Sequence, residues 1–146
     1  MDEATIRTAR TGDEARCLEL LGILRRGDVH PGAGEIFRQL LDGARGQVLV
    51  AEDAETGEIL GSASVTYNPA MRYGGEYCQL EELIVDPVAR GRNIGALLVN
   101  ATIEAASSRG CREYGLYLLE HTKHNLKFYE RFGLERIGDE LRMRLP

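Results

Sequence analysis

The sequence predicts an α/β fold in a single domain over residues 1–146. We expect a mixed, mainly antiparallel sheet with one parallel strand pair, flanked by about four helices. Two observations predict this class. The apolar patterns follow the order β-α-α-β-β-β-α-β-α-β without an internal repeat or a long linker. In addition, a strand–helix–strand succession over residues 77–119 needs a crossover, which makes two strands parallel.

The first half of the chain supplies three strands and two helices. Apolar residues recur at helical spacing after Asp13, and a loop with Pro31 and three glycines separates the two helices. Thr56-Gly57 marks a hairpin turn, and Asn68–Gly75 is expected to be an exposed loop. The predicted elements are a strand at Ala4–Arg10, helices at Asp13–Arg25 and Glu35–Ala44, and strands at Gln47–Glu52 and Glu58–Tyr67.

The second half alternates strands and helices. Its first strand is closed by Asp86-Pro87, and the helix that follows keeps one apolar stripe as far as Ala105 before Gly110 stops it. Thr122 can cap the last helix, which Gly133 ends. The predicted elements are strands at Tyr77–Val85 and Tyr114–Leu119, a helix at Lys123–Phe132, and a final strand at Leu134–Leu145.

Composition and charge exclude several classes of protein. The formal net charge is −5 at pH 7, which disfavours a nucleic-acid surface, because such surfaces concentrate Lys and Arg. The three cysteines form no CxxC pair, so neither a disulfide framework nor a zinc site is predicted. No apolar h-region or membrane-length run is present. We therefore expect a cytoplasmic protein with no metal and neither a membrane nor a nucleic-acid partner.

The most informative segment is Leu80–Val99, LEELIVDPVARGRNIGALLV. An apolar strand ends, a short loop with two arginines and a glycine follows, and a helix begins at once. The first amides of a helix lack intrahelical acceptors and its dipole favours an anion, so this geometry suits a pyrophosphate. The segment has neither the P-loop Gly-Lys-Ser/Thr nor the dinucleotide GxGxxG. From spacing alone, phosphate binding and close packing of the helix on the sheet are equally supported.

Two motifs in this half resemble those of a known family. Arg90-Gly91-Arg92-Asn93-Ile94-Gly95 is similar to the acetyl-CoA signature of GNAT N-acetyltransferases, Arg/Gln-x-x-Gly-x-Gly/Ala, with Asn93 replacing the middle glycine. Downstream, Asn125–Leu134 (NLKFYERFGL) resembles the family's Asn-x-x-x-Phe-Tyr-Glu-Arg-x-Gly-Phe, with Leu134 replacing the final Phe. Family members that act on amino sugars and aminoalkylphosphonates look most similar.

The resemblance implies a GNAT-like fold and direct transfer of an acetyl group from acetyl-CoA to an amine in a ternary complex. Acetyl-CoA would lie between the Tyr77–Val85 and Tyr114–Leu119 strands. The implied cofactor residues are the main chain around Leu83, Ile84 and Val85 for the pantetheine arm, the loop of Arg90, Gly91, Arg92, Asn93, Ile94, Gly95 and Ala96 for the pyrophosphate, and Asn125 and Tyr129 for the pantetheine and the sulfur.

Three side chains are candidates for proton transfer. Glu81 and Glu82 stand in an otherwise apolar strand, where an unused carboxylate is costly to bury, and a carboxylate can act through water as the base for an amine. Neighbours on a strand face opposite ways, so we expect only one to serve, with Glu81 preferred. The alternative is that one or both glutamates make structural hydrogen bonds or reach solvent at a bulge. Tyr129 is the candidate acid for the departing thiolate, with core packing as its alternative.

The acceptor is predicted to be the primary amine of a small molecule. Its pocket would form from the Asp28–Gly34 and Asn68–Gly75 loops, with Arg72, Tyr73 and Tyr117 as candidate contacts. A protein or peptide acetyltransferase and a non-catalytic acyl-CoA sensor are the alternatives. Cys78 and Cys111 stand in no recognisable nucleophile motif, and His121 and His124 lack a third metal ligand. Dimers are common in the family, so a homodimer is also an expectation.

Overall fold

The structure is a computed structural model that describes residues 4–146. The chain forms two compact units that meet in sequence at Tyr114 and Gly115. The elements of the first unit are β1 (Ala4–Thr8), α1 (Glu14–Arg25), α2 (Ala33–Leu40), β2 (Gly46–Asp53), β3 (Ile59–Ala70), β4 (Gly75–Val85) and α3 (Ile94–Arg109). β5 (Tyr114–Gly115) stands at the boundary, and α4 (Leu126–Glu130) belongs to the second unit.

The strands form one five-stranded sheet in the order β1-β2-β3-β4-β5. The first three neighbouring pairs are antiparallel. Towards β5, the Arg112 amide donates to the Glu76 carbonyl at 2.7 Å and the Cys78 amide donates to the Glu113 carbonyl at 2.8 Å. Both partners advance in the same direction along the chain, which makes this pair parallel. The predicted class, a mixed and mainly antiparallel sheet with helices, is confirmed.

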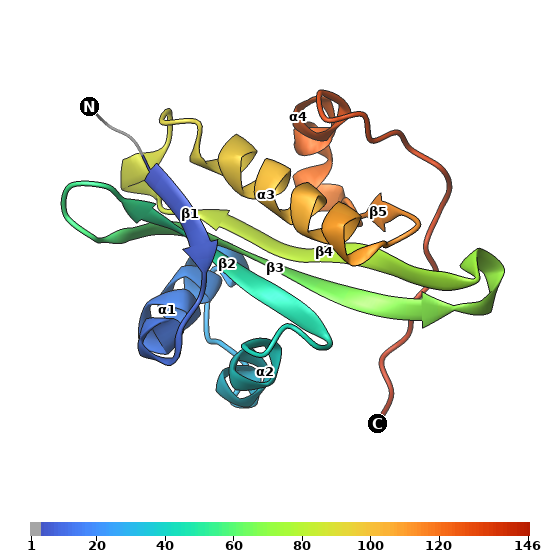
Figure 1. The fold of residues 1–146 in the computed structure, drawn as a ribbon, viewed down its shortest axis with the longest axis horizontal. Helices are drawn as coiled ribbons and strands as arrows, with labels where there is room; N and C mark the ends of the chain where they lie inside the picture. The colour runs from blue at the N-terminus through green and yellow to red at the C-terminus, as the bar shows by residue number, and fades with distance from the viewer. Residues whose placement is uncertain (1–3) are drawn as a thin grey trace. The chain divides into compact units, whose positions relative to one another are not determined.

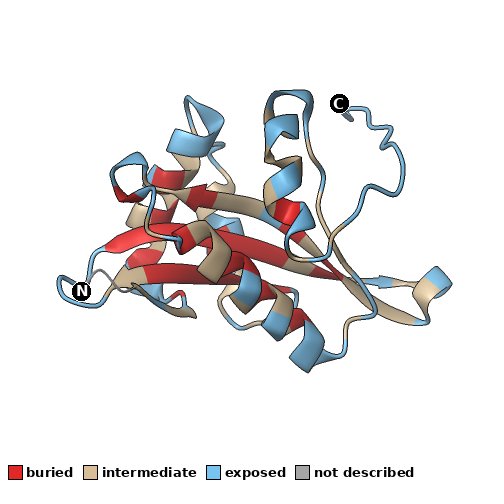
Figure 2. Cartoon of the chain, turned by 90° about the horizontal axis from the view of Figure 1, so that it is seen from above, coloured by how far each residue is buried: buried red, intermediate tan, exposed pale blue. Residues whose placement is uncertain are grey.

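Helices cover both faces of this sheet (Figure 1), with α1 and α2 on one face and α3 on the other. On the first face, Val48 and Val50 of β2 pack into a core with Leu20 of α1 and Phe37 of α2. Because side chains alternate along a strand, the intervening residues face α3. The buried side chains therefore concentrate in the central strands (Figure 2).

One glycine sets how closely α3 lies on β3. A Cβ atom added to Gly61 would stand 2.8 Å from the Ile84 carbonyl oxygen, 3.2 Å from Ile94 Cγ2 and 3.3 Å from Leu98 Cδ1. Any larger side chain would push the helix away from the sheet. Ile94, the first residue of α3, is thereby fixed in the core at 2% exposure.

Three predicted helices are confirmed in place, with changed ends. α1 begins one residue after the predicted start and ends where predicted, and α3 stops at Gly110 in the left-handed conformation. The second predicted helix, Glu35–Ala44, is instead α2 at Ala33–Leu40. Over the residues that the structure describes, no helix is long and apolar enough to cross a membrane.

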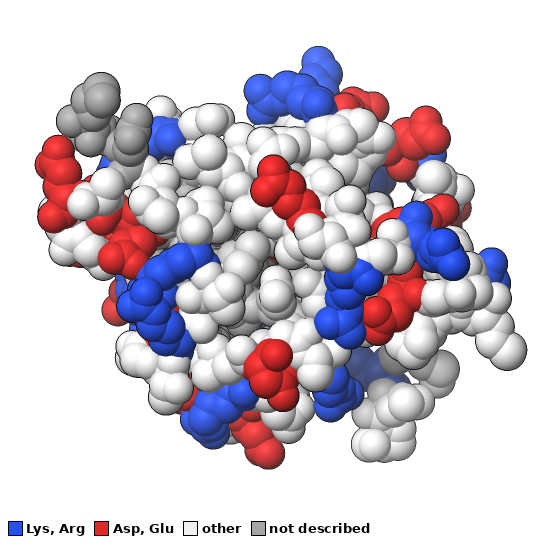
Figure 3. All heavy atoms as spheres, in the orientation of Figure 1, with Lys and Arg blue, Asp and Glu red and all other residues white. Residues whose placement is uncertain are grey.

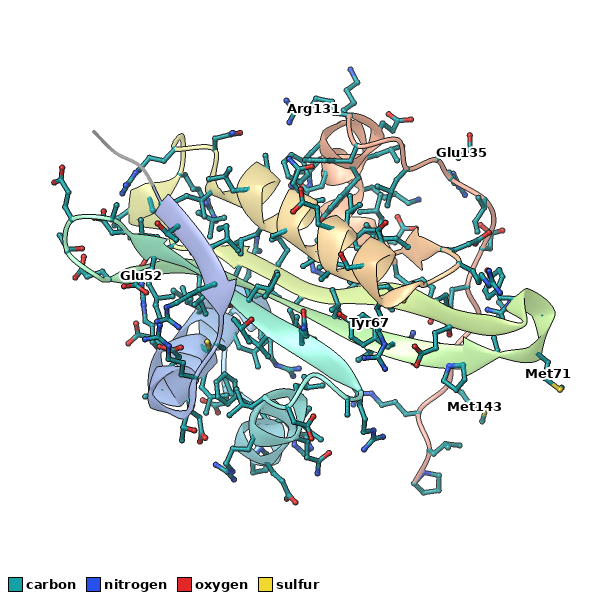
Figure 4. The ribbon with its side chains drawn as sticks, viewed as in Figure 1. Glu52, Tyr67, Met71, Arg131, Glu135 and Met143 are labelled. Atoms are coloured by element: carbon teal, nitrogen blue, oxygen red, sulfur yellow. The ribbon has the colours of Figure 1, made fainter. Side chains whose placement is uncertain are left out.

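The hairpin between β3 and β4 is longer than predicted. Asn68–Gly75 was expected to be an exposed loop, but β3 runs to Ala70 and β4 starts at Gly75, with a single 3-10 turn at Met71–Tyr73 between them. Pro69 is accommodated near the strand end, where a missing amide is tolerated. Met71 lies at the tip and projects from it (Figure 4).

One prediction for the C-terminal third is wrong, and two elements are shorter than predicted. No strand forms at Leu134–Leu145, and the strand predicted at Tyr114–Leu119 is limited to the two residues of β5. The helix predicted at Lys123–Phe132 is present as α4, which follows a 3-10 segment at Glu120–Asn125. An alternating pattern specifies which face a strand would bury, but a strand also needs a hydrogen-bonding neighbour.

Candidate functional site

A β-bulge in β4 carries two acidic side chains. The β3–β4 register pairs Ser64 with Glu82 but Val65 with Leu80, so Glu81 is the extra residue on β4. The Ser64 hydroxyl hydrogen-bonds to Glu82 Oε1, and the Thr66 hydroxyl donates to Glu81 Oε2 at 2.7 Å. Each glutamate therefore has its own hydroxyl partner on the neighbouring strand.

The bulge brings both carboxylates to one face of the sheet. Ser64 and Thr66 are two residues apart on a strand and so point the same way. Ser64 pairs with Val48, whose side chain belongs to the core below α1 and α2, so this is the α1 and α2 face. The expectation that Glu81 and Glu82 face opposite ways is wrong, because the regular alternation of side chains is interrupted at the extra residue.

The two glutamates differ in environment. Glu81 is exposed and Glu82 is partly buried. Burial raises the pKa of Glu82 above the ordinary value for a glutamic acid, the Ser64 hydroxyl opposes this shift, and the charge of Glu81 adds to it. The Thr66 hydroxyl, which donates to Glu81, in turn accepts a hydrogen bond from the side-chain Nδ2 of Asn68 at 3.1 Å. The pair thus combines an accessible anion with a carboxyl whose basicity is increased.

Beyond the bulge, the main-chain N–H and C=O groups of every second residue of β4 point away from β3. The Asp86 amide donates to the Leu60 carbonyl at 2.8 Å, which fixes the even-numbered residues here as the ones bonded to β3. The main-chain groups of Leu83 and Val85 consequently point to the opposite edge of the strand. Ile84 is bonded towards β3 and its side chain is buried in the α1 and α2 core. Leu83 and Val85 therefore have the orientation that binding an extended ligand along β4 requires.

The loop after β4 has an unusual backbone. Asp86 caps the 3-10 turn Pro87–Ala89 by accepting from the Val88 amide at 3.0 Å. Gly91 then has φ +88° and Asn93 has φ +63°, both left-handed, and α3 starts at Ile94. Asn tolerates this conformation better than most residues do, so the replacement of a signature glycine at position 93 is accommodated.

The start of α3 presents unpaired amides. The helix has no side-chain cap, and the Leu97 amide bonds to the Asn93 carbonyl at 3.1 Å. The amides of Ile94, Gly95 and Ala96 precede this first bond and have no acceptor within the helix. A Cβ at Gly91 would meet no atom within 4 Å, so the neighbouring surface is open. Amides at the positive end of a 16-residue helix, beside open space, fit the phosphates of a nucleotide cofactor.

The two arginines of the loop are used differently. Arg90 is exposed. Arg92 is partly buried and its Nη2 donates to Asp53 Oδ2 at 3.2 Å, at the end of β2. In this loop Arg90 is therefore exposed to solvent, whereas Arg92 is held in place by Asp53.

The second unit holds the other predicted motif. Asn125 ends the 3-10 segment and precedes α4, in which Tyr129 is buried at 9% exposure. Burial raises the pKa of Tyr129, so its phenol stays protonated at neutral pH. Phe128 makes edge contacts with Tyr129 and with Phe132, at ring distances of 5.0 and 5.3 Å. The packing role assigned to the two phenylalanines is consistent with these contacts.

Comparison with known proteins decides the family. Residues 16–134 match the model of the acetyltransferase (GNAT) family. A protein named glucosamine 6-phosphate N-acetyltransferase from Trypanosoma brucei brucei is 30% identical over 144 residues, which cover 96% of this chain and 95% of that protein. The chain belongs to the GNAT acetyltransferase family. The prediction of an acetyl-CoA-dependent N-acetyltransferase is thereby confirmed.

Solved structures of similar proteins agree with a GNAT fold. An acetyltransferase from Trypanosoma brucei is 29% identical and superposes with a TM-score of 0.81, covering 98% of this chain and all of that one. A protein described as a transcriptional regulator from Bacillus halodurans C-125 is 28% identical with a TM-score of 0.85, at the same coverage. GNAT enzymes use acetyl-CoA as their co-substrate.

Within the first unit, the predicted acceptor contacts Arg72 and Tyr73 of this GNAT enzyme do not lie beside the glutamates. Arg72 and Tyr73 occupy the tip of the β3–β4 hairpin, where Arg72 stacks over Tyr73 and the Tyr73 hydroxyl donates to Glu113 at 2.9 Å. Six residues of β3 separate Ala70 from Ser64, the partner of Glu82, which is about 20 Å of strand. Tyr117 lies in the second unit under the Arg142 guanidinium, 5.3 Å from the ring centroid.

Other reactive side chains do not form a second centre. Burial raises the pKa of the Cys78 thiol to about 12, so it remains a poor nucleophile. Burial also raises the pKa of Cys111. Within residues 4–146 no group of three His, Cys, Asp or Glu side chains is arranged to hold a metal ion.

Sequence reasoning missed three partners of the site. Ser64 and Thr66 alternate with buried residues in the strand ILGSASVTY, and two hydroxyls on one face of a central strand were a readable signal for a polar site. Asp53 carried no signal, because its role depends on a hairpin that brings it to Arg92 across 39 residues of sequence.

Proposed function

We propose that this chain transfers an acetyl group from acetyl-CoA to the primary amine of a small molecule by direct attack in a ternary complex. The observation that carries the proposal is the bulge in β4. It places two carboxylates, Glu81 and Glu82, on one face of the strand that leads through a short loop to an open array of amides at the start of α3. Acidic side chains suit an ammonium group, and the amides suit a diphosphate.

The residues present fit acetyl-CoA. The amides at Ile94, Gly95 and Ala96, with the open space beside Gly91 and the exposed Arg90, would bind the pyrophosphate. The main chain of Leu83 and Val85 would bind the pantetheine arm along the outer edge of β4. When bound, acetyl-CoA supplies the activated acetyl thioester.

The two glutamates would have different roles towards the acceptor amine. The exposed Glu81 would attract the acceptor as an ammonium ion. Glu82, whose pKa is raised by burial, would take the proton from the nitrogen directly or through one water, so that the free amine can attack. This assignment reverses the preference for Glu81 as the base, because burial raises the pKa of Glu82.

Tyr129 would act as the acid. Its phenol is protonated at neutral pH, and a proton is needed by the thiolate that leaves when the new amide bond forms. The protons then balance. Glu82 takes one proton from the ammonium ion, the acetyl group passes to nitrogen, and the phenolic proton passes to sulfur. The second proton that nitrogen loses as the amide forms returns to the Tyr129 phenolate.

The acceptor class is proposed from chemistry and from one relative. Two carboxylates within one strand favour a compact cationic amine over an apolar acceptor. The relative that covers almost the whole chain is named for glucosamine 6-phosphate. Amino-sugar phosphates are therefore the first compounds to test, followed by aminoalkylphosphonates, diamines and peptides.

A second copy of the chain is the proposed partner, in the cytoplasm. In the C-terminal segment, four apolar side chains follow a strand-like alternation but lie uncovered, with exposures of 88% for Ile137, 96% for Leu141, 78% for Met143 and 81% for Leu145. Such a row in an extended segment is suited to pairing with another strand. Light scattering should give twice the chain mass of 16.2 kDa, and Leu141→Asp should give the monomer.

A panel of amines with release of free CoA as the readout tests the proposed function. We expect one compact amine to be acetylated with a kcat/KM at least about 100-fold above the median of the panel. Preferred turnover of peptides would replace the small-molecule acceptor with a protein. Tight binding of CoA without turnover of any amine would identify a sensor instead of an enzyme.

A further inference from the structure

We propose that Asp53 is a positioning residue for the cofactor loop, which it holds through Arg92 in the arrangement that binds acetyl-CoA. The proposal rests on the proposed function. It assigns a role to the β2–β3 hairpin, which carries none of the family motifs.

The hairpin organises the Asp53 carboxylate before Arg92 reaches it. Asp53 Oδ1 accepts from the Glu55 amide at 2.8 Å and from the Thr56 amide at 3.0 Å. The main chain of Asp53 is fixed too, because its amide donates to the Glu58 carbonyl at 2.7 Å. The other oxygen, Oδ2, is left to accept from Arg92. The carboxylate therefore has one orientation, and that orientation is directed at the loop.

The carboxylate is also kept ionised. The amides of Thr56 and Glu55 lower the pKa of Asp53, and the Arg92 guanidinium lowers it further. Both members of the pair are largely shielded, with side-chain exposures of 23% for Arg92 and 16% for Asp53. A charged pair shielded in this way loses less to solvent screening than a surface ion pair does.

Arg92 is located where it controls the backbone. It lies between Gly91 and Asn93, the two left-handed residues of the loop. On one side of this stretch, Ile94 is buried between α3 and the sheet. On the other side, Arg92 is hydrogen-bonded to Asp53 at the end of β2. A left-handed non-glycine residue persists only where its surroundings enforce it, and these two anchors flank Asn93.

The Arg92 guanidinium already has a hydrogen-bonded counter-ion in the protein. Its Nη2 bonds to Asp53 and its Nε is buried without a partner among the described residues. Removal of Asp53 would leave a shielded cation without its counter-charge, which favours movement of Arg92 towards solvent. Because Arg92 is part of the loop, that movement would disturb the amides beside it.

A positioning role and a simple electrostatic role predict opposite signs. Asp53 is an anion near a proposed diphosphate site, so on charge alone its removal should strengthen acetyl-CoA binding. If it positions the loop, removal should weaken binding. The sign of the change therefore discriminates between the two roles without a comparison of magnitudes.

The test uses Asp53→Asn, with Glu58→Gln as the matched control. Glu58 lies beyond the same turn, is exposed, and its removal changes the net charge by the same amount. Titration calorimetry with acetyl-CoA should give a dissociation constant raised about tenfold in Asp53→Asn and unchanged in Glu58→Gln. In an Arg92→Met background, Asp53→Asn should have no further effect, because the two residues act as one unit.

Hydrogen exchange of the unliganded protein gives a second readout. The Leu97 amide, which bonds to the Asn93 carbonyl at 3.1 Å, should exchange about tenfold faster in Asp53→Asn than in Glu58→Gln, while the amides in the middle of α3 should not change. Unchanged exchange, or acetyl-CoA binding that is equal or tighter in Asp53→Asn, would overturn the role of Asp53. Failure of the unsubstituted chain to bind acetyl-CoA would overturn the proposed function instead, and exchange would still decide whether Asp53 orders the loop.

Discussion

The glutamate pair of β4 and the loop before α3 are separated by a few residues of one chain but are built on opposite principles. At the glutamates the proposed chemistry lies in side chains, and the backbone supplies only the bulge that turns Glu81 and Glu82 to one face. At the loop the proposed binding of the cofactor relies on main-chain amides, and the side chains of Ile94 and Arg92 supply the anchoring.

This difference determines what each region can tolerate. A main-chain site accepts many side chains, provided that each backbone conformation is allowed, as Asn93 shows in place of a glycine. A side-chain site is changed by removing one charge. Substitutions at the glutamates should therefore affect turnover, and substitutions at the loop should affect the affinity for acetyl-CoA.

The protein surface carries mixed charge. On the face shown in Figure 3, basic and acidic side chains alternate without a continuous basic area. Specificity for an anionic cofactor must then come from local amides rather than from the net charge of −5.

Glu82→Gln should have the largest effect. It keeps the shape of the side chain and its contact with Ser64 but removes the base, so kcat/KM for the amine should fall about 10²- to 10⁴-fold. The dissociation constant for acetyl-CoA, measured by calorimetry, should stay within about twofold. Glu81→Gln is the matched control, and a larger loss of kcat in that variant would transfer the role of base to Glu81.

Gly95→Glu should have the next largest effect, and this effect should be on the affinity for acetyl-CoA. The substitution puts bulk and negative charge in the first turn of α3, where the phosphates would bind, so acetyl-CoA affinity should fall at least about 100-fold. Gly95→Ala adds a methyl group without charge and serves as the control. Unaltered binding by a folded Gly95→Glu protein, checked by its melting temperature, would contradict the assignment of the cradle.

How far the sequence could predict each region follows from the same contrast. The loop was predicted residue by residue because its signals are local: a strand end, a short turn, and a residue that tolerates φ +63° at position 93. The helix that follows was predicted to its last turn for the same reason. Assignment to a face failed at Glu81, because a bulge depends on how two strands align and leaves no trace in either strand alone.

The C-terminal third shows the other limit. The alternation of apolar residues from Leu134 to Leu145 is a real property of the sequence, yet no strand forms there in the described structure. A β-strand requires a neighbouring strand to which it can hydrogen-bond, and the periodicity of its own residues does not identify that strand. Long-range contacts such as Asp53 with Arg92 are beyond local patterns for the same reason.

Tyr129→Phe should have an intermediate effect. Without the phenolic proton, the thiolate would leave unprotonated, so kcat should fall about 10- to 100-fold while the dissociation constant for acetyl-CoA changes little. The ring and its contact with Phe128 are kept, so stability should not change. Phe132→Leu, which alters the same aromatic cluster, is the control. An unaffected kcat would assign Tyr129 to packing alone.

Ser64→Ala should have the smallest effect and the most specific one. The Ser64 hydroxyl lowers the pKa of Glu82, so its removal should raise that pKa further above the ordinary glutamate value. The base works only when deprotonated, and activity is lost as the pH falls through its pKa. The acid limb of the kcat/KM profile should therefore move to higher pH in Ser64→Ala, with little change at alkaline pH. Thr66→Val removes the hydroxyl that serves Glu81 and should leave this limb in place. A shift in Thr66→Val and none in Ser64→Ala would show that the exposed carboxylate, and not the buried one, accepts the proton.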